Sequence, residues 1–321
     1  MSEIVTRPPY DPELEAVLAT VSDQMPTTYT LDMIPMMRQG LPLDLADEDL
    51  TAAGAMRRDF TIKGYNDADI LVSVIARADH GERGPGIYYT HGGGMVAGNQ
   101  MSGMHVVLPW IIAHDAVAVS VNYRLAPEFP DPFPVEDCYA GLIWTIEHAA
   151  ELGIDPLRVM IAGASAGGGL AAGTALLARD RGGPHLTAHL LMCPMLDDRD
   201  DTSSAAQFEG VGTWDRASNV MAWTALLGDR RKTGEVSIYA APARARDLSG
   251  LPPAFIDCGA AEVFRDEDVA YAQALWRAGV QAELHVWPGG FHGFDMLAPE
   301  AGISKAAIAA RDAWVARQLA A

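Results

Sequence analysis

A serine lies at the centre of a glycine-framed stretch, Gly-Ala-Ser-Ala-Gly at residues 163–167. The apolar run before it, residues 159–162, predicts a buried parallel strand, and the alanine-rich run after it, residues 170–181, predicts a helix. Ser165 would then occupy a sharp strand-to-helix turn, with strained backbone, small neighbours and an exposed oxygen above a helix N-terminus. This context favours a nucleophilic serine over an ordinary glycine-rich turn.

A second glycine-rich stretch, His-Gly-Gly-Gly at residues 91–94, follows a predicted strand at residues 87–90. Consecutive glycines let backbone N–H groups converge on one point, as the oxyanion of an acyl-transfer reaction requires. Taken alone, the stretch is also consistent with a flexible turn or an anion nest. A phosphate-binding role is disfavoured because no Gly-Lys-Ser/Thr follows. We expect His91 to orient the loop rather than to act as a base.

His292 lies in a glycine-rich segment, residues 287–294, directly after the last predicted strand. A histidine at the carboxyl end of a parallel strand can reach a serine on a neighbouring turn, although a purely structural histidine is the alternative interpretation. Its place after the serine and after a group of acids matches one of the known chain orders of catalytic triads. That order favours a base.

The acid that would orient this histidine should follow the predicted strand at residues 254–258. Asp257 falls within that strand, and residues 266–268 begin a helix, where acids also stabilise the helix dipole. Glu262 lies in the loop between them, where an orienting carboxylate is expected. The residues alone leave the choice among these acids open.

The elements that must position these residues alternate between strand and helix along most of the chain, which predicts a mainly parallel eight-stranded sheet with helices on both faces. Ligands then bind beyond the carboxyl ends of the strands. The expected strands are residues 58–63, 70–76, 87–90, 116–122, 159–162, 188–192, 254–258 and 283–287, and the expected helices are residues 103–114, 135–152, 170–181, 265–278 and 304–319.

Two stretches depart from this alternation. Residues 1–50 lack strand signals, and helices are expected at residues 12–21 and 47–58, with Asp11 and Asp47 as N-caps. Residues 194–246 interrupt the pattern after the sixth strand. We expect both stretches to form a helical cap on a catalytic domain made of residues 51–193 and 247–321.

Composition excludes several classes of function. The 321 residues carry a formal net charge of −19, which argues against nucleic acid or an anionic membrane as partner. The three cysteines show no zinc-site spacing, and no apolar run suggests membrane insertion, so we expect a cytoplasmic protein without a cofactor. The acidic run at residues 197–201 lacks the spacing of a calcium loop and predicts a solvated face, so no metal is expected.

The motifs together resemble the hormone-sensitive-lipase-like carboxylesterases, also called bacterial family IV. The similar motifs are His91-Gly-Gly-Gly94, Tyr123-Arg-Leu-Ala-Pro-Glu128, Gly163-Ala-Ser-Ala-Gly167, Glu262-Val-Phe-Arg-Asp-Glu267 and His292-Gly-Phe294. They occur in the family's order over about residues 60–320. The resemblance implies an α/β-hydrolase fold with a cap.

The resemblance also implies roles for single residues. Ser165 matches the nucleophile, His292 the base, and Glu262 the position of the family's acid. The oxyanion donors match Gly93, Gly94 and Ala166. Residues 123–128 match a motif that supports the site without chemistry of its own.

The sequence departs from the family at several of these positions. The acid is Glu262 rather than the usual Asp, with Asp266 as the runner-up, and Val263 replaces a proline. Met95 stands where an aromatic residue is frequent, and we expect it, with Trp214, to contact substrate.

The resulting expectation is a serine carboxylesterase acting on short- to medium-chain esters of small molecules. An amidase or lactonase with the same triad is an alternative. So is a non-catalytic small-ligand receptor on the same scaffold, although receptors similar to this family lack the histidine that this chain has at position 292. The sequence leaves a homodimer open.

Overall fold

One eight-stranded sheet organises the computed structural model, which describes residues 6–39 and 44–320. The spatial order is β1-β2-β4-β3-β5-β6-β7-β8. The strands β3 to β8 are parallel to one another, whereas β2 pairs antiparallel with both β1 and β4. The strands are β1 (Ala55–Lys63), β2 (Asp69–Arg77), β3 (Gly84–Thr90), β4 (Val117–Asn122), β5 (Ile154–Ala164), β6 (Ala188–Met192), β7 (Ala254–Gly259) and β8 (Ala282–Trp287). The expected eight-stranded, mainly parallel sheet is confirmed.

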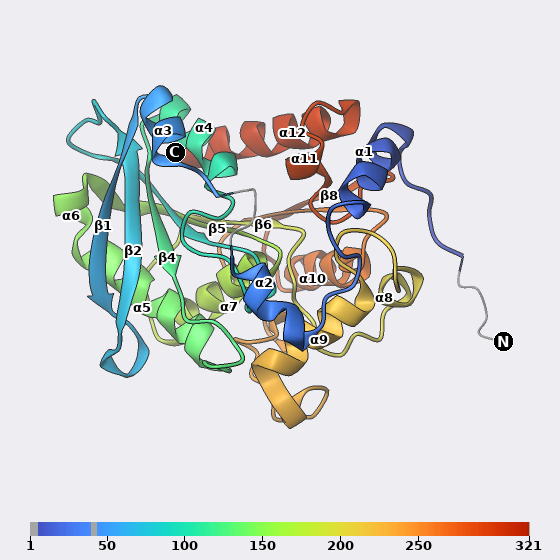
Figure 1. The fold of residues 1–321 in the computed structure, drawn as a ribbon. Helices are drawn as coiled ribbons and strands as arrows, with labels where there is room; N and C mark the ends of the chain where they lie inside the picture. Colours follow the sequence, from blue (N-terminus) through green and yellow to red (C-terminus); the bar gives the residue numbers. More distant parts are fainter. Residues whose placement is uncertain (1–5, 40–43, 321) are drawn as a thin grey trace.

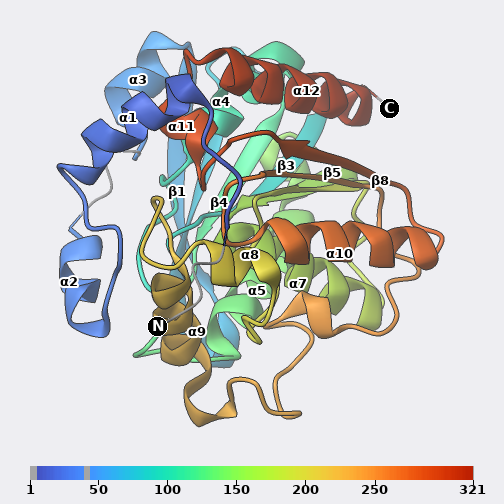
Figure 2. The same ribbon diagram turned by 90° about the vertical axis from the view of Figure 1, so that its right-hand side faces the viewer.

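Helices cover both faces of the sheet (Figures 1 and 2). On one face lie α4 (Met104–His114) and α12 (Gly302–Leu319), and on the other lie α5 (Phe133–Glu147), α7 (Ala166–Asp180) and α10 (Arg265–Arg277). Successive strand residues point to opposite faces of the sheet, and each face has its own hydrophobic cluster. In β5, Val159 and Ile161 belong to one cluster, and Met160 and Ala162 belong to the other. A strand buried on both faces needs apolar side chains at every position, which explains its continuous apolar run.

Several boundaries differ from the expected ones, and β1 and β3 each begin three residues earlier. The helix expected over residues 47–58 is the shorter α3 (Asp47–Ala52), because Gly54 takes a left-handed conformation, with φ of 77°, and ends it. Asp47 is the first residue of α3 rather than its N-cap. The helix expected over residues 135–152 is divided into α5 and α6 (Ala149–Leu152). The strand expected at residues 159–162 is the longer β5, which begins at Ile154 and contains an irregularity where the register against β3 shifts.

The N-terminal and inserted segments pack against one another. The first contains α1 (Pro12–Ser22), η1 (Leu31–Met33) and α2 (Ile34–Met37), and the second contains α8 (Ser203–Gln207) and α9 (Arg216–Leu227). Asp11 caps α1 as expected, accepting hydrogen bonds from the backbone N–H groups of residues 13 and 14. Thr28 donates to Asp215 at 2.7 Å, and the Tyr29 backbone N–H donates to Ser218 at 2.8 Å. Residues 1–5 and 40–43 of the expected cap lie outside the described residues.

In the part of the chain that the structure describes, no helix has the length and apolar character needed to span a bilayer.

Candidate active site

Ser165 lies at the turn between β5 and α7, where the sequence predicted it. Its φ of 56° and ψ of −125° are unfavourable for a residue with a side chain, and such strain is found at functional sites. Two backbone contacts hold the strained residue: its N–H donates to the Met192 carbonyl at 2.8 Å, and its carbonyl accepts from the Met195 N–H at 2.9 Å. A Cβ at Gly167 would collide with the Thr90 carbonyl, so the turn requires a glycine there.

His292 connects Ser165 to Glu262. Its Nε2 lies 2.9 Å from Ser165 Oγ, and its Nδ1 lies 2.6 Å from Glu262 Oε2. A carboxylate can only accept at Nδ1, so Nδ1 carries the proton and the lone pair of Nε2 faces the serine hydroxyl. The second oxygen of Glu262 accepts from the Gly259 N–H at 2.7 Å, which fixes the carboxylate at the end of β7. Glu262 is 2 % exposed, so solvent does not compete for this contact.

The other candidate acids lie elsewhere. Asp266, in the first turn of α10, accepts from the Ser204 N–H at 2.8 Å and from Arg265 Nε at 2.7 Å, and the arginine and serine contacts lower the pKa of its carboxyl although burial opposes them. Asp257 instead accepts from Arg311 at 2.8 Å. The structure therefore brings Glu262, and not the runner-up Asp266, to the histidine.

The glycine-rich loop after β3 lies beside the serine. Gly93 and Gly94 have φ of 108° and 64°, which turn the backbone in ways that residues with side chains rarely adopt. Gly93 and Gly94 line the same pocket as Ser165, and Ala166 follows the serine as the first residue of α7. Backbone N–H groups from such a loop and a helix N-terminus are the donors that an oxyanion needs.

Residues 123–128 support this loop from behind. Tyr123 Oη donates to the His91 carbonyl at 2.8 Å, and the Ala126 N–H donates to the Met95 carbonyl at 2.9 Å. Glu128 forms a bidentate ion pair with Arg38 of the N-terminal segment, at 2.8 and 2.7 Å. The motif thus fixes the loop's backbone without reaching the pocket.

An apolar pocket of about 930 Å³, open to solvent, surrounds Ser165 and His292. Beside the serine and the histidine, its walls come from four parts of the chain: the N-terminal segment, the glycine-rich loop and the residues around it, the insertion, and the residues after the histidine. The lining residues include Met25, Tyr29, Met37, Tyr89, Gly92, Gly93, Gly94, Ala97, Ser102, Gly103, Thr213, Trp214, Met296 and Leu297. Its composition suits an apolar substrate with one polar group at the serine.

Of the two residues expected to contact substrate, one lines the pocket and the other does not. Trp214 lines the pocket, and its ring lies so close to Gly94 that a Cβ there would come within 2.8 Å of it. Met95 is 1 % exposed, lies in the core cluster and is not part of the pocket wall. It is the residue after the glycines, with φ of 61°, and the local turn directs it away from the substrate side.

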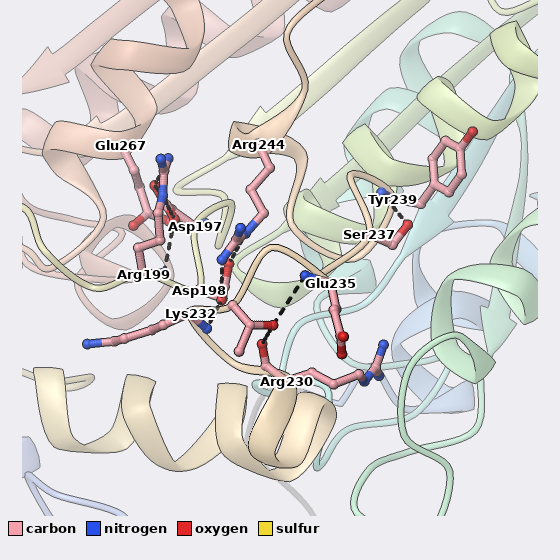
Figure 3. A network of polar contacts seen from close by, with 11 residues as sticks. Asp197, Asp198, Arg199, Arg230, Lys232, Glu235, Ser237, Tyr239, Arg244 and Glu267 are labelled. Atoms are coloured by element: carbon pink, nitrogen blue, oxygen red, sulfur yellow. Dashed lines mark hydrogen bonds and ion pairs between the residues drawn. The ribbon is translucent and has the colours of Figure 1, made fainter.

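The acidic run at residues 197–201 is not the solvated face that the sequence predicted. Asp198 is fully buried and accepts from Arg244 Nε at 2.5 Å and from the Lys232 N–H at 2.7 Å (Figure 3). Asp200 pairs with Arg216 at 2.8 Å. The missed signal was the set of arginines within the insertion itself, which supply the counter-charges.

Glu267 anchors the same segment to the sheet domain. Its Oε1 accepts from the Leu196 and Asp197 N–H groups at 2.7 and 3.2 Å (Figure 3). Burial, together with the nearby Asp197 and Asp200, raises the pKa of this carboxyl well above its ordinary value. The acids of this region are therefore structural.

Sequence reasoning missed several residues of the site. Thr213 donates from Oγ1 to the His292 carbonyl at 2.5 Å, which joins the insertion to the histidine loop. Met25, Met37 and Met296 line the pocket without any motif of their own. Among the described residues, one group of three side chains has donor atoms close enough for a metal ion, and it consists of Cys193, Glu262 and His292.

Comparison with known proteins agrees with this geometry. A family model described as alpha/beta hydrolase fold matches residues 87–296. The carboxylesterase NlhH of Mycobacterium tuberculosis is 36% identical over 299 residues, covering 90% of each chain, and an arylesterase of Saccharolobus solfataricus is 28% identical over 288 residues, covering 89% of this chain and 92% of its own.

Solved structures give the same result over the full chain. A bacterial heroin esterase superposes with a TM-score of 0.88 at 36% identity, covering 97% of this chain and 98% of its own. The esterase LipW from Mycobacterium marinum superposes with a TM-score of 0.85 at 32% identity, covering 98% and 99%. The chain belongs to the hormone-sensitive-lipase-like family of the α/β-hydrolase fold and is a carboxylic ester hydrolase.

Proposed function

We propose that Ser165, His292 and Glu262 hydrolyse carboxylic esters through an acyl-enzyme. The observation that carries the proposal is the continuous contact from Ser165 Oγ through both ring nitrogens of His292 to the buried Glu262 carboxylate. In this arrangement the imidazole accepts the serine proton as Oγ attacks the ester carbonyl, and the carboxylate stabilises the imidazolium that forms.

The remaining steps use the same residues. The N–H groups of Gly93, Gly94 and Ala166 would stabilise the oxyanion of the tetrahedral intermediate. The imidazolium returns its proton to the departing alcohol, which leaves Ser165 acylated. Water, deprotonated by His292, then attacks the acyl carbonyl, and the acid departs as Ser165 recovers its proton.

We propose further that the substrates carry short to medium acyl chains. Side chains of residues 6–39 and of the insertion, including Met25, Tyr29 and Trp214, form part of the pocket wall, which supports a cap role for both segments. The insertion is compact and offers no long amphipathic helix for a lipid interface, since its longest described helix is α9 with 12 residues. In a series of soluble p-nitrophenyl esters, kcat/KM should peak at a short or medium acyl length. Faster hydrolysis of emulsified long-chain triglyceride would contradict this.

The deciding experiment mixes a high enzyme concentration with p-nitrophenyl butyrate and records nitrophenol release and the intact mass of the protein. An initial burst, with a butyryl adduct on the wild type and none on Ser165→Ala, is the expected result. Ser165→Ala should keep the fold and lose several orders of magnitude in turnover. More than a few per cent of residual activity in a pure Ser165→Ala preparation would exclude the serine mechanism.

Matched amide and lactone substrates in the same assay test the amidase and lactonase alternatives. No structural observation favours either of them, and the intact histidine–carboxylate contact speaks against a receptor. Homodimer formation and a cytoplasmic location stay predictions.

A further inference from the structure

Cys193 lies directly behind the proposed triad. It follows β6, is 8 % exposed and has φ of 38°, and its backbone N–H donates to the Asp257 carbonyl at 2.6 Å. Its Sγ, a carboxylate oxygen of Glu262 and a ring nitrogen of His292 all lie within 4.8 Å of one another. The mechanism proposed above gives this thiol no task.

The surroundings of this thiol are negatively charged. Burial raises the pKa of Cys193, and the carboxylates of Glu262, Asp295, Asp257 and Asp268 raise it further. Arg311 is bonded at 2.8 Å to Asp257 and to Asp295, which leaves Glu262, the partner of His292, outside that ion-pair network. Burial and the neighbouring acids raise the pKa of Asp268 well above its ordinary value, which favours its neutral form. Glu262 lies within reach of the same point as the Cys193 thiol, so its carboxylate can supply both a donor atom and negative charge to a bound cation.

We propose that Cys193, Glu262 and His292 form an inhibitory binding site for a borderline or soft divalent cation, with Zn²⁺ and Cd²⁺ as the chemical type. Thiolate sulfur, imidazole nitrogen and carboxylate oxygen are the donors that zinc takes in proteins, at about 2.0–2.3 Å from the metal. Donor atoms at that distance lie about 3–4 Å apart in a tetrahedron, so small side-chain movements from the observed triangle suffice.

Binding is an exchange of a proton for the metal. Bonds form from the cation to Cys193 Sγ, to one oxygen of Glu262 and to one nitrogen of His292. The thiol proton passes to solvent. Where Nδ1 is the ligand, the ring changes tautomer, so that Nδ1 gives up its proton and Nε2 takes one up. The imidazole stays neutral, and no atom is oxidised or reduced. A metal-bound His292 can no longer take the serine proton in its proper orientation. The inhibition, though not the binding, therefore rests on the proposed function.

Cys258 provides a matched control. It is also a buried, reduced cysteine, at the end of β7, and it belongs to the same acidic surroundings. Its thiol is not part of the triangle of donor atoms. A thiol effect that depends on burial and charge alone would thus be shared by both cysteines, whereas a chelate effect would follow Cys193 only.

The binding test uses the Ser165→Ala enzyme, in which the three donor side chains are intact and turnover plays no part. Cd²⁺ is titrated while the ultraviolet charge-transfer absorption of a cadmium–thiolate bond is recorded. We expect saturation at one cation per chain, loss of the band in Ser165→Ala/Cys193→Ala, and its retention in Ser165→Ala/Cys258→Ala. Cations held by surface carboxylates give no such band, so the acidic surface of the protein does not interfere. Absence of the band, or its survival without Cys193, would overturn the proposal.

The inhibition test measures ester hydrolysis by the wild type against Zn²⁺ concentration. The half-inhibitory Zn²⁺ concentration of each variant is measured against its own uninhibited rate. It should be at least about tenfold higher for Cys193→Ala than for the wild type, because even the loss of a residue that only supports a metal ligand costs 10–100-fold in metal affinity. Cys258→Ala should resemble the wild type. Cys193→Ser serves as a second variant if Cys193→Ala folds poorly by circular dichroism. Equal zinc sensitivity with and without Cys193 would refute the inhibitory site, and undiminished activity of Ser165→Ala would instead refute the proposed function.

Discussion

Two histidines of this protein follow parallel strands and enter glycine-rich loops, yet they lie in opposite environments. His91, after β3, is fully buried; its ring stacks on Tyr123 with centroids 4.1 Å apart, and its Nδ1 donates to the Gly92 carbonyl at 2.8 Å. His292, after β8, has a carboxylate on one nitrogen and a serine hydroxyl on the other. Burial lowers the pKa of His91 to about 4.

The comparison shows what makes a histidine a candidate base. An imidazole that gains a proton needs a nearby negative charge to stabilise it, and Glu262 supplies that charge to His292 alone. His91 is fully buried, and this burial favours its neutral form although the contact with the Gly92 carbonyl opposes it. Its contribution is to the backbone, through the carbonyl that accepts from Tyr123.

The largest expected effect separates the two histidines directly. His292→Gln should lower kcat by about 10⁴-fold or more, because members of a catalytic triad act as a unit. His91→Asn should keep most of the turnover, since its ring takes no proton. Steady-state kinetics on folded variants measure both. A collapse of kcat in His91→Asn, with a nearly unchanged His292→Gln, would reverse the assignment.

Removing the carboxylate should make His292 more like His91. Glu262→Gln is expected to lower kcat by as much as about 10⁴-fold, because the amide can impose the wrong tautomer. KM should change little. Asp266→Asn is the matched control, because Asp266 lies four residues later, in the first turn of α10. It should mainly lower the thermal midpoint, since Asp266 binds Ser204 and Arg265. A collapsed kcat in folded Asp266→Asn would give the role to that residue.

The buried histidine should show itself in stability rather than in catalysis. The pKa of His91 is about 4 in the folded protein, against an ordinary value of 6.5 in the unfolded chain, so only the unfolded chain binds this proton between those values. Stability is therefore lost as the pH falls through that window, by about 2 kcal/mol between pH 7 and pH 5. Urea unfolding of wild type and His91→Asn at the two pH values measures the difference. Burial also lowers the pKa of His189 to about 4, so this residue adds the same pH dependence to the wild type and to the variant. If the free energy of unfolding changed equally with pH in the wild type and in His91→Asn, the prediction for His91 would be contradicted.

The smallest expected effect concerns the support of the His91 loop. Tyr123→Phe removes one buried hydrogen bond to the His91 carbonyl, at about 1 kcal/mol of stability. If the bond also positions the oxyanion donors, kcat should fall by a few-fold while KM stays constant. A fall in the thermal midpoint with unchanged kcat would show that the contact is structural only.

Local patterns predicted the sheet and the Ser165 turn, because a strand buried on both faces and a strained turn each dictate their own residue types. The order of the motifs placed Glu262 correctly beside His292 in space. Contacts between distant segments could not be predicted in the same way. Nothing around residue 193 indicates that its thiol approaches His292, and the burial of Asp198 depends on Arg244, which lies 46 positions away. Met95 shows the same limit, because its burial in the core depends on packing with residues distant in the sequence.

The ion pair between Asp198 and Arg244 joins the two ends of the inserted segment. The chain between Asp198 and Arg244 therefore leaves the sheet domain and returns to it at the same place. Glu267 holds the backbone of residues 196 and 197 there. The segment is thus a closed loop whose ends are already held together, so a change in its length adds little closure entropy. Residues 199–243 are consequently a natural unit for exchange between related enzymes. Such an exchange would keep the Asp198–Arg244 ion pair and replace the part of the pocket wall that Trp214 forms.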